Sequence, residues 1–450
     1  MVHSFLGSNN RNRKMKANAR LLCLEHLESR VVPATGSFNS STGTLSFNYT
    51  SSGSTVESVT LTNNGTTITA TGNVSGTTNF STSAVKAILI TASGSSTAQV
   101  LSFAGTSTFN ISSGLSVTGI ESVTIGAVIN TGSSNFSMTL GQGVAINSAI
   151  TTTTGNITIV CNNGTNSFTG NFYGIRASAN VTTTGGNIDW IGRGGTDSSG
   201  NKVGILIDNG STVSTGGNGS IKLSGTGGLS SGVYNHGVAI VGKNSARSTI
   251  VKTANGNIEI NGTGGGVTNG GGSNYGVYIQ IGGVVSAGGI GSVSVNASGG
   301  LPSGGMGLYI DADAISGDNS TFIGSSGGQI TINAIGGGAG NSLGFRGRGQ
   351  IGIVSDIPSL ASVNQNIILN LIPGPTGSLG IYNETSLGKI ISGTGNIEIN
   401  SDYYTSFWGI TSLVTSGKLS LLQAGSGFLS AFKMSSFLSG YQVNSSGNGF

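Results

Sequence analysis

One short pattern recurs through the middle of the chain: a glycine, a small polar residue, and then an apolar, a polar and an apolar residue. It first appears clearly as Gly-Asn-Ile-Thr-Ile at 155–159. Further copies start 31 to 37 residues apart, at 186–190, 219–223, 256–260, 291–295 and 328–332. The alternation predicts β-strands whose apolar side chains face a core and whose central polar side chain faces solvent. A self-similar unit at this spacing is typical of a solenoid.

A second glycine-led strand follows most copies, as in Gly204-Ile-Leu-Ile and Gly276-Val-Tyr-Ile. Because this second strand begins about half-way through each repeat, the pattern favours two coils of about 18 residues per repeat. The stretch between residues 120 and 420 would then contain about 16 coils. The alternative is one larger coil per repeat. Asp189, Lys222 and Glu259 take the same outward position in three successive repeats. Two coils per repeat would separate them by about 9.6 Å and leave them weakly coupled, which is the expected outcome.

The pattern predicts an all-β fold, a single-stranded right-handed parallel β-helix (β-solenoid) over 120–355 with a short N-terminal β cap. Residues 35–119 are rich in Ser and Thr, and Asn63-Asn-Gly65 predicts a hairpin between two of their strands. Residues 356–450 are expected to form an irregular solenoid end and a C-terminal cap, because prolines interrupt strand pairing there. Glycine supplies 80 of 450 residues, and we assign its clusters between the strands, such as those within 263–266 and at 336–338, to short corners with positive φ.

Residues 1–34 differ from the rest of the chain. They hold six of the 19 basic residues and account for the whole net charge of +4. The remainder is therefore neutral, and we expect no nucleic-acid partner. Leu24-Glu-His-Leu-Glu-Ser-Arg30 resembles the N-terminal motif of many large planctomycete exported proteins, Leu-Glu-x-Leu-Glu-x-Arg. The resemblance implies an export leader and an extracellular or cell-surface location; the alternative is a frayed basic helix of a cytosolic protein.

The glycine-led units of 151–355 resemble the β-helical repeats of filamentous haemagglutinin-like adhesins and autotransporter passengers. The Asn-Pro-Asn-Gly signature of two-partner-secreted haemagglutinins and the calcium-binding nonapeptide are both missing from the sequence. No apolar run reaches the 18 residues that indicate a membrane-spanning helix, so we expect no transmembrane segment. The resemblance implies a secreted structural or adhesive protein.

Acidic residues recur four positions after several second glycines. These acidic corner candidates are Asp208, Asp311, Asp356 and Glu384, with Asp313 two residues beyond Asp311. This interpretation treats Gly307, Gly352 and Gly380 as equivalent positions. Three consecutive coils would then place Asp311, Asp356 and Glu384 at one corner. Paired carboxylates could serve acid and base chemistry on a glycosidic bond or bind calcium. The alternative is a solvated corner that keeps the solenoid soluble.

Three tyrosines, Tyr278, Tyr309 and Tyr382, share an outward position on the second strand. Such a stripe could contact glycans by stacking on sugar faces, or it could simply stabilise neighbouring coils. His236 is the only histidine after the leader and is interpreted as a turn residue. A lone histidine builds neither a metal site nor a catalytic triad, so we expect no metal and no cofactor.

Charged side chains make up only 8% of the chain and are scattered. A catalytic cleft needs convergent charged groups, so the sequence favours a structural or adhesin-like solenoid over an enzyme. The expected partners are extracellular glycans or envelope components. The alternative is a β-helical polysaccharide lyase or glycoside hydrolase that uses Asp311, Asp313 and Asp356.

Overall fold

The computed structural model describes residues 33–50, 56–76, 78–93, 98–164, 168–243, 248–302, 304–311 and 321–338, and shorter stretches between 345 and 444. Residues 31–450 form one unit. The regular elements among the described residues are all β-strands. The proposed leader lies outside the described residues except for its last two positions.

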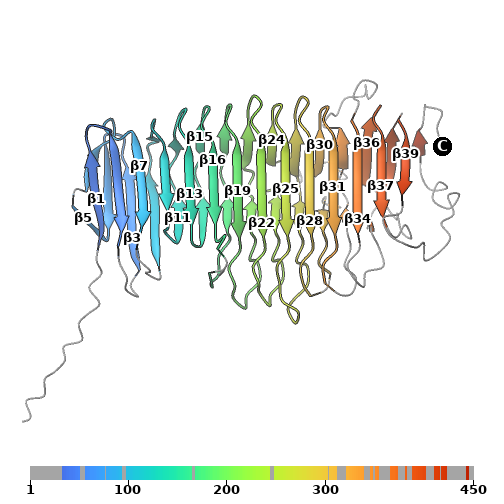
Figure 1. Cartoon of the computed structure of the whole chain (residues 1–450), viewed down its shortest axis with the longest axis horizontal. Coiled ribbons are helices and arrows are strands. Elements are labelled where there is room, and N and C mark those ends of the chain that lie inside the picture. The colour runs from blue at the N-terminus through green and yellow to red at the C-terminus, as the bar shows by residue number, and fades with distance from the viewer. Residues whose placement is uncertain are drawn as a thin grey trace, which may run out of the picture. The chain divides into compact units, whose positions relative to one another are not determined.

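Each coil of the solenoid contributes one strand to each of three open sheets, and successive coils lie side by side in chain order (Figure 1). The first sheet contains, in spatial order, β5 (Val74–Gly76), β1 (Ala34–Asn39), β2 (Thr44–Tyr49), β7 (Ala87–Ala92), β10 (Leu115–Thr118), β13 (Phe136–Leu140), β16 (Ile157–Cys161), β19 (Ile188–Arg193), β22 (Ile221–Thr226), β25 (Ile258–Thr263), β28 (Val293–Ser298), β31 (Ile330–Ile335), β34 (Ile367–Ile372), β37 (Ile397–Ser401) and β39 (Leu419–Leu422).

The other two sheets are built in the same order along the stack. The second sheet contains β6 (Asn79–Ser81), β4 (Thr67–Gly72), β3 (Glu57–Asn63), β8 (Gln99–Gly105), β11 (Ser122–Ile125), β14 (Gly143–Ile146), β17 (Ile175–Ala177), β20 (Ile205–Ile207), β23 (Val238–Val241), β26 (Val277–Gln280), β29 (Leu308–Asp311), β32 (Phe345–Gly347) and β35 (Ile381–Tyr382). The third sheet contains β9 (Phe109–Asn110), β12 (Ile129–Asn130), β15 (Ile150–Thr152), β18 (Val181–Thr183), β21 (Thr212–Thr215), β24 (Thr249–Thr253), β27 (Gly283–Ala287), β30 (Phe322–Ser325), β33 (Gln350–Ile353), β36 (Gly388–Gly393), β38 (Ile410–Thr415) and β40 (Gln442–Asn444).

The parallel β-helix predicted from the sequence is confirmed, but its coil is larger than expected. Copies of the repeated pattern pair directly, with Asp189 beside Lys222 and Lys222 beside Glu259. One repeat is therefore one coil, and the expected two-coil register is wrong. Between residues 120 and 420 the first sheet has ten described strands, β13 to β39, rather than about 16. The error arose because the third strand of each coil was not recognised.

The core runs along the inside of the coils. On each first-sheet strand the two apolar residues of the pattern are buried, as at Ile157 and Ile159, and the residue between them is more open. Trp190 is the largest fully buried side chain among the described residues. The second and third sheets add residues such as Ile205 and Val213 to the same core. Because each coil packs mainly on its two neighbours, the core extends with every repeat.

The first coils carry the predicted antiparallel strands. β3 and β4 form a hairpin with Asn63 opposite Ile68, as the Asn-Asn-Gly sequence predicts. The side chain of Asn63 accepts a hydrogen bond of 2.8 Å from the Gly65 amide, and Gly65 has a φ of 101°. β1 pairs antiparallel with β2. Parallel stacking already begins where β7 pairs with β2 and β8 with β3, before residue 120.

The glycine that opens each first-sheet repeat is needed for close packing between coils. A Cβ added to Gly186 would lie 2.1 Å from the carbonyl oxygen of Gly155, and one added to Gly256 would lie 2.0 Å from that of Gly219. Neither glycine has a φ in the left-handed region. At these two positions close approach rather than positive φ requires glycine, because the backbone of the preceding coil occupies the space of a side chain.

Candidate binding surfaces on the side of the solenoid

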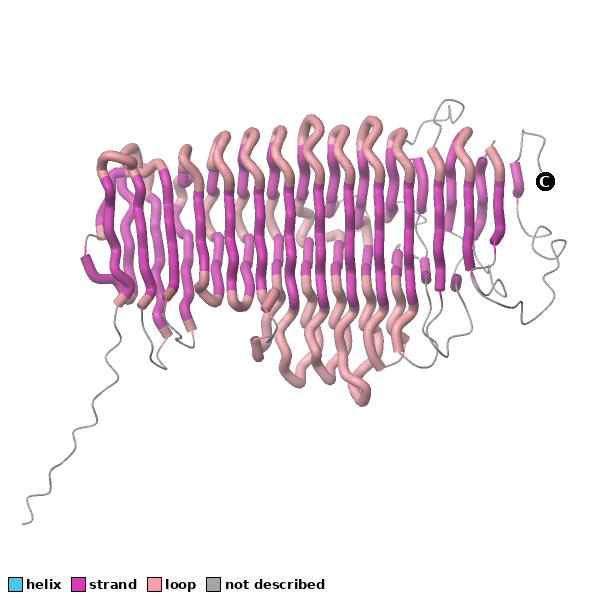
Figure 2. Tube along the Cα trace, viewed as in Figure 1, coloured by secondary structure: helices cyan, strands magenta, loops and turns pink. Residues whose placement is uncertain are grey.

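Five rings form an aromatic cluster on the outer face of the second sheet: Tyr234, His236, Tyr275, Tyr278 and Tyr309. Tyr278 and Tyr309 are neighbours in register on β26 and β29, with ring centroids 5.4 Å apart. The other three rings come from the loops that join the first sheet to the second. Figure 2 shows these loops in pink beyond the ends of the first-sheet strands. The aromatic cluster therefore combines strand and loop residues.

His236 lies at the centre of the aromatic cluster. Its ring stacks on Tyr275 at 4.9 Å and lies at the same centroid distance from Tyr278. Its Nδ1 accepts a hydrogen bond of 3.2 Å from the Tyr275 amide. Burial lowers the pKa of His236 to about 3, so the ring is neutral at physiological pH. Rather than a simple turn residue, His236 is a packed member of the cluster.

The members of the aromatic cluster differ in their access to solvent. Tyr275 and Tyr309 are both only 7% exposed, whereas Tyr234 is 49% exposed and Tyr278 is half-buried. Burial is the main reason that the pKa of Tyr278 is raised, and the charge of Asp311 adds to it. A ligand can therefore reach Tyr234 and part of Tyr278. Sequence reasoning missed Tyr234 because nothing in its spacing showed that its loop folds over the second sheet.

The third predicted tyrosine is separated from the other two. Tyr382 lies on β35, whose register partner on β32 is Arg346, and β32 in turn pairs with β29 with Tyr309 opposite Arg346. The tyrosine stripe is thus interrupted by one coil. The side chain of Tyr382 lies outside the described residues.

The predicted acidic corner rests on an alignment that is wrong. Gly352 lies on β33 of the third sheet, paired with Gly324, and is not equivalent to Gly307, which precedes β29 of the second sheet. Counting four residues from Gly352 and from Gly307 therefore does not give equivalent positions, and Asp356 is not the counterpart of Asp311. Asp313, Asp356 and Glu384 lie outside the described residues. Asp311 ends β29 opposite Gln280 of the neighbouring coil.

Asp208 follows β20 and is fully engaged with the preceding coil. One of its oxygens accepts hydrogen bonds from Arg176 at 2.9 and 3.1 Å, and the other accepts one from the Ser178 hydroxyl at 2.5 Å. Asp208 and Asp311 lie three coils apart, about 14 Å along the stack. The structure does not bring these two acids together.

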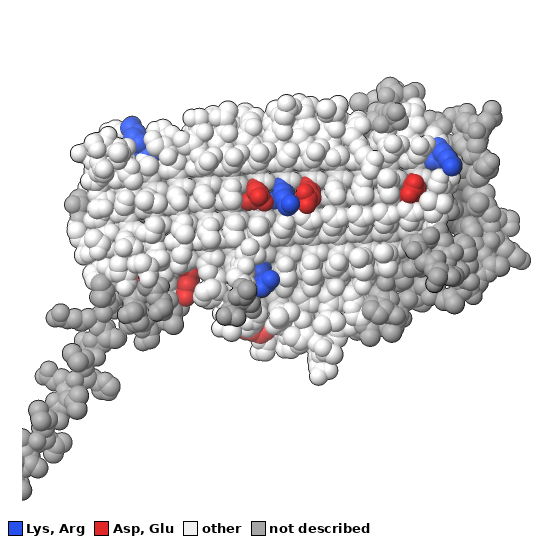
Figure 3. Space-filling view, viewed as in Figure 1, with Lys and Arg blue, Asp and Glu red and all other residues white. Residues whose placement is uncertain are grey.

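Other charged side chains also form ion pairs with each other. Lys222 Nζ lies 3.3 Å from Glu259 Oε1. Figure 3 shows that charged side chains are few on the face it draws and that some of them lie next to side chains of opposite charge. Hydrogen bonds from Asn261 and then from Lys222 lower the pKa of Glu259. Lys202 is completely buried and lies 3.1 Å from Asp197. In the described part of the chain, no three metal-ligating side chains lie together.

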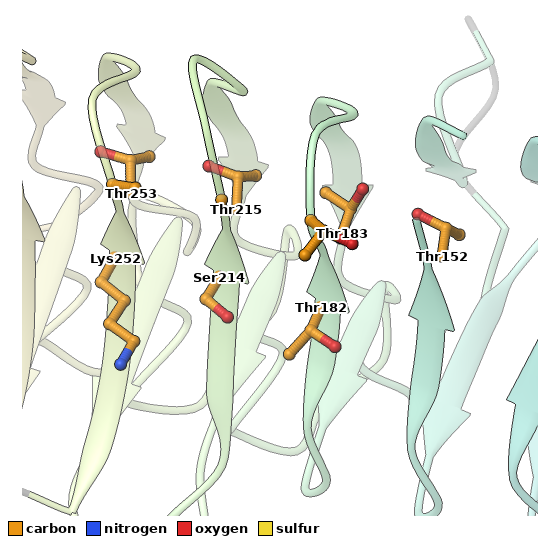
Figure 4. A pocket seen from close by; sticks show the side chains of 10 residues that line it. Thr152, Thr182, Thr183, Ser214, Thr215, Lys252 and Thr253 are labelled. Carbon is orange, nitrogen blue, oxygen red and sulfur yellow. The ribbon is translucent and has the colours of Figure 1, made fainter. Parts of the chain in front are cut away.

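A shallow groove of about 470 Å³ runs across the outer face of the third sheet (Figure 4). It is lined by Thr152, Thr182, Thr183, Thr184, Ser214, Thr215, Gly216, Lys252, Thr253 and Ala254. The inward hydroxyls of Thr152 and Thr253 donate to the carbonyls of Gly155 and Gly256, at 2.6 and 2.5 Å. Thr182, Ser214 and Lys252 lie side by side in register on the outer face.

Comparison with known proteins gives no relative: the chain matches no protein-family model, no curated protein and no solved structure. None of the described residues form a helix with the length and apolarity needed to cross a membrane. Any function must therefore be argued from these surfaces.

Proposed function

We propose that this protein is an exported, cell-surface structural or adhesin-like β-solenoid that contacts glycans through its side. The aromatic cluster carries the proposal. It places the exposed ring of Tyr234 near the half-buried ring of Tyr278, with His236 between them. Rigid aromatic rings with one exposed side suit stacking against the apolar face of a sugar. Packing against Tyr275 and Tyr309 holds the ring of Tyr278 in place before a ligand arrives, and Tyr234 contacts the ring of His236.

Two further observations support a binding rather than a catalytic role. Asp208 and Glu259 each pair with a basic residue of a neighbouring coil, and Asp197 pairs with Lys202 of its own loop, so these carboxylates stabilise the surface of the solenoid. The repeated coils also present similar polar surfaces many times along one chain. Weak contacts to a polymer gain strength when several are made at once. Export itself is implied by the resemblance of the leader motif to planctomycete exported proteins.

Binding to a panel of neutral and acidic polysaccharides tests the proposal. We expect binding without release of sugar, and we expect Tyr234→Ala and Tyr278→Ala each to weaken the binding of neutral polysaccharides, by about 1–2 kcal/mol for a stacked ring. Tyr173→Ala is the matched control, because Tyr173 is a half-buried tyrosine that packs against Arg176 elsewhere on the surface. Equal binding by all three variants would contradict the role of the aromatic cluster.

If the protein is instead an enzyme, the same panel of polysaccharides should give a different result. Turnover of a polysaccharide that is lost in Asp311→Asn would replace the binding role with catalysis.

Fractionation of the native cells tests export: recovery of the protein only from the cytosol would contradict the surface location.

A further inference from the structure

The outer face of the third sheet carries a column of residues, one per coil, which are mostly small and polar from Asn110 to Ser286 and end in two glycines. In register the column reads Asn110, Asn130, Thr151, Thr182, Ser214, Lys252, Ser286, Gly324 and Gly352. We call these residues the third-sheet column. It contains neither a carboxylate nor an aromatic ring. Its members recur at the strand spacing of about 4.8 Å, which is comparable to the length of one sugar unit in an extended chain.

Lys252 is the single cation of the third-sheet column, and its side chain is exposed. Among the described residues it has no ion-pair partner, in contrast to Lys222, which pairs with Glu259. Its neighbours in the column are the hydroxyls of Ser214 and Ser286. The groove in Figure 4 lies over this part of the column. A ligand here meets one positive charge flanked by hydroxyl groups.

We propose that the third-sheet column binds a linear acidic polysaccharide, with a uronate carboxylate on Lys252 and sugar hydroxyls on Ser214 and Thr182. Hydroxyl side chains donate and accept hydrogen bonds, as sugar hydroxyls do. The uronate carboxylate accepts a charge-assisted hydrogen bond from the Lys252 ammonium group.

Other classes of partner fit the column less well. A peptide could not add as a strand, because β21 and β24 already pair with a strand on each side. A nucleic acid needs several basic residues along its backbone, and the column holds one. An apolar protein surface would leave the Thr and Ser hydroxyls without hydrogen-bond partners.

The proposal deepens the proposed function, because it names a ligand class for the exported surface, but it uses a different face from the aromatic cluster. The test measures binding of the full chain to polygalacturonate and to its fully methyl-esterified form. We expect the charged polymer to bind and the ester, which keeps the backbone but lacks the charge, to bind several-fold more weakly. Binding to polygalacturonate should also weaken as the salt concentration rises.

Two variants locate the site. Lys252→Gln should weaken binding by about three- to five-fold, the effect of one exposed ion pair, and bring the charged polymer and the ester to similar affinity. Ser214→Leu should weaken the binding of both polymers, because the larger side chain fills the groove without changing its charge. Lys222→Gln is the matched control, since Lys222 lies on the first sheet and already pairs with Glu259.

The outcomes separate this site from the aromatic cluster. Tyr278→Ala should leave polygalacturonate binding unchanged if the third-sheet column is the site. Loss of binding in Tyr278→Ala but not in Lys252→Gln would overturn the inference and retain the aromatic site. No binding of polygalacturonate, or equal binding by wild type and Lys252→Gln, would also overturn it.

Discussion

Two adjacent glycines offer a direct test of how the coils pack. Gly185 and Gly186 lie in the same turn, between β18 and β19, and neither has a φ in the left-handed region. A Cβ on Gly185 would meet nothing nearer than 3.6 Å, which is an ordinary contact. A Cβ on Gly186 would lie 2.1 Å from the carbonyl oxygen of Gly155 in the preceding coil. The same substitution, glycine to alanine, thus makes only ordinary contacts at one position and meets backbone at the next.

The expected costs follow from these distances. An ordinary contact between a carbon and an oxygen needs about 3.4 Å, so Gly186→Ala would have to move the neighbouring backbone by more than about 1 Å. Forcing extra atoms into a packed interior costs about 1–3 kcal/mol, and more where the obstacle is backbone. Gly185→Ala should change stability by less than about 1 kcal/mol, and could raise it by restricting the unfolded chain.

Denaturant unfolding of both variants and native-state hydrogen exchange of β16 and β19 provide the measurement. Exchange is needed because a solenoid unfolds in sections, and local opening need not change the global transition. In Gly186→Ala the amides of β16 and β19 should exchange faster than in wild type, while in Gly185→Ala they should exchange at the wild-type rate. Stabilities of the two variants within 0.5 kcal/mol of each other, at roughly the error of such experiments, would refute the close-packing explanation.

Three further changes test other parts of the structure. A double-mutant cycle on Lys222 and Glu259 should give a coupling of about 0.2–1 kcal/mol, and a coupling of zero would contradict their 3.3 Å contact. Burial raises the pKa of Glu121 from its ordinary value of 4.5 to about 7, so the folded chain keeps a proton that the unfolded chain has released. The contribution of Glu121 to the free energy of unfolding should therefore fall as pH rises from about 4.5 to 7 and stay level above pH 7; Glu121→Gln should remove this fall. Trp190→Ala should cost about 3–5 kcal/mol, whereas Trp190→Phe should cost much less because none of the described residues accepts a hydrogen bond from the buried indole N–H.

The first sheet could be predicted from the sequence because its strands alternate strictly. Isoleucines such as Ile258 and Ile260 face the core, and Glu259 between them faces outward. Period-two alternation of this kind distinguishes a half-buried strand from a helix or a loop. The hairpin at Asn63 and Gly65 was equally clear, because its turn residues match the conformation that the hairpin needs.

The third sheet could not be predicted in the same way. Its strands place Thr183, Thr215 and Thr253 in buried positions, where a pattern of apolar residues would not find them. These threonines are buried because their hydroxyls bond to carbonyls of the adjoining turn, as Thr215 does to Gly219 at 2.5 Å. Missing this strand halved the apparent coil, and it also hid the groove that contains Lys252.

The aromatic cluster was only partly predictable. Strand spacing placed Tyr278 and Tyr309 at equivalent positions, and the register confirms that they are neighbours. Their burial depends on Tyr275 and His236, which belong to loops of unequal length. The path of such loops is set by contacts with neighbouring coils, which have no regular spacing in the sequence.

Every surface discussed above depends on one coil per repeat, and a pair of engineered cysteines tests this most directly. Ser294 and Thr331 are register partners on β28 and β31, so cysteines there would lie about 4.8 Å apart, within the range that a disulfide spans. In a Cys23→Ser background, with Cys161 buried, Ser294→Cys with Thr331→Cys should form a disulfide on mild oxidation, whereas Glu259→Cys with Thr331→Cys, two coils apart, should not. No disulfide in the first pair would contradict the single-coil repeat.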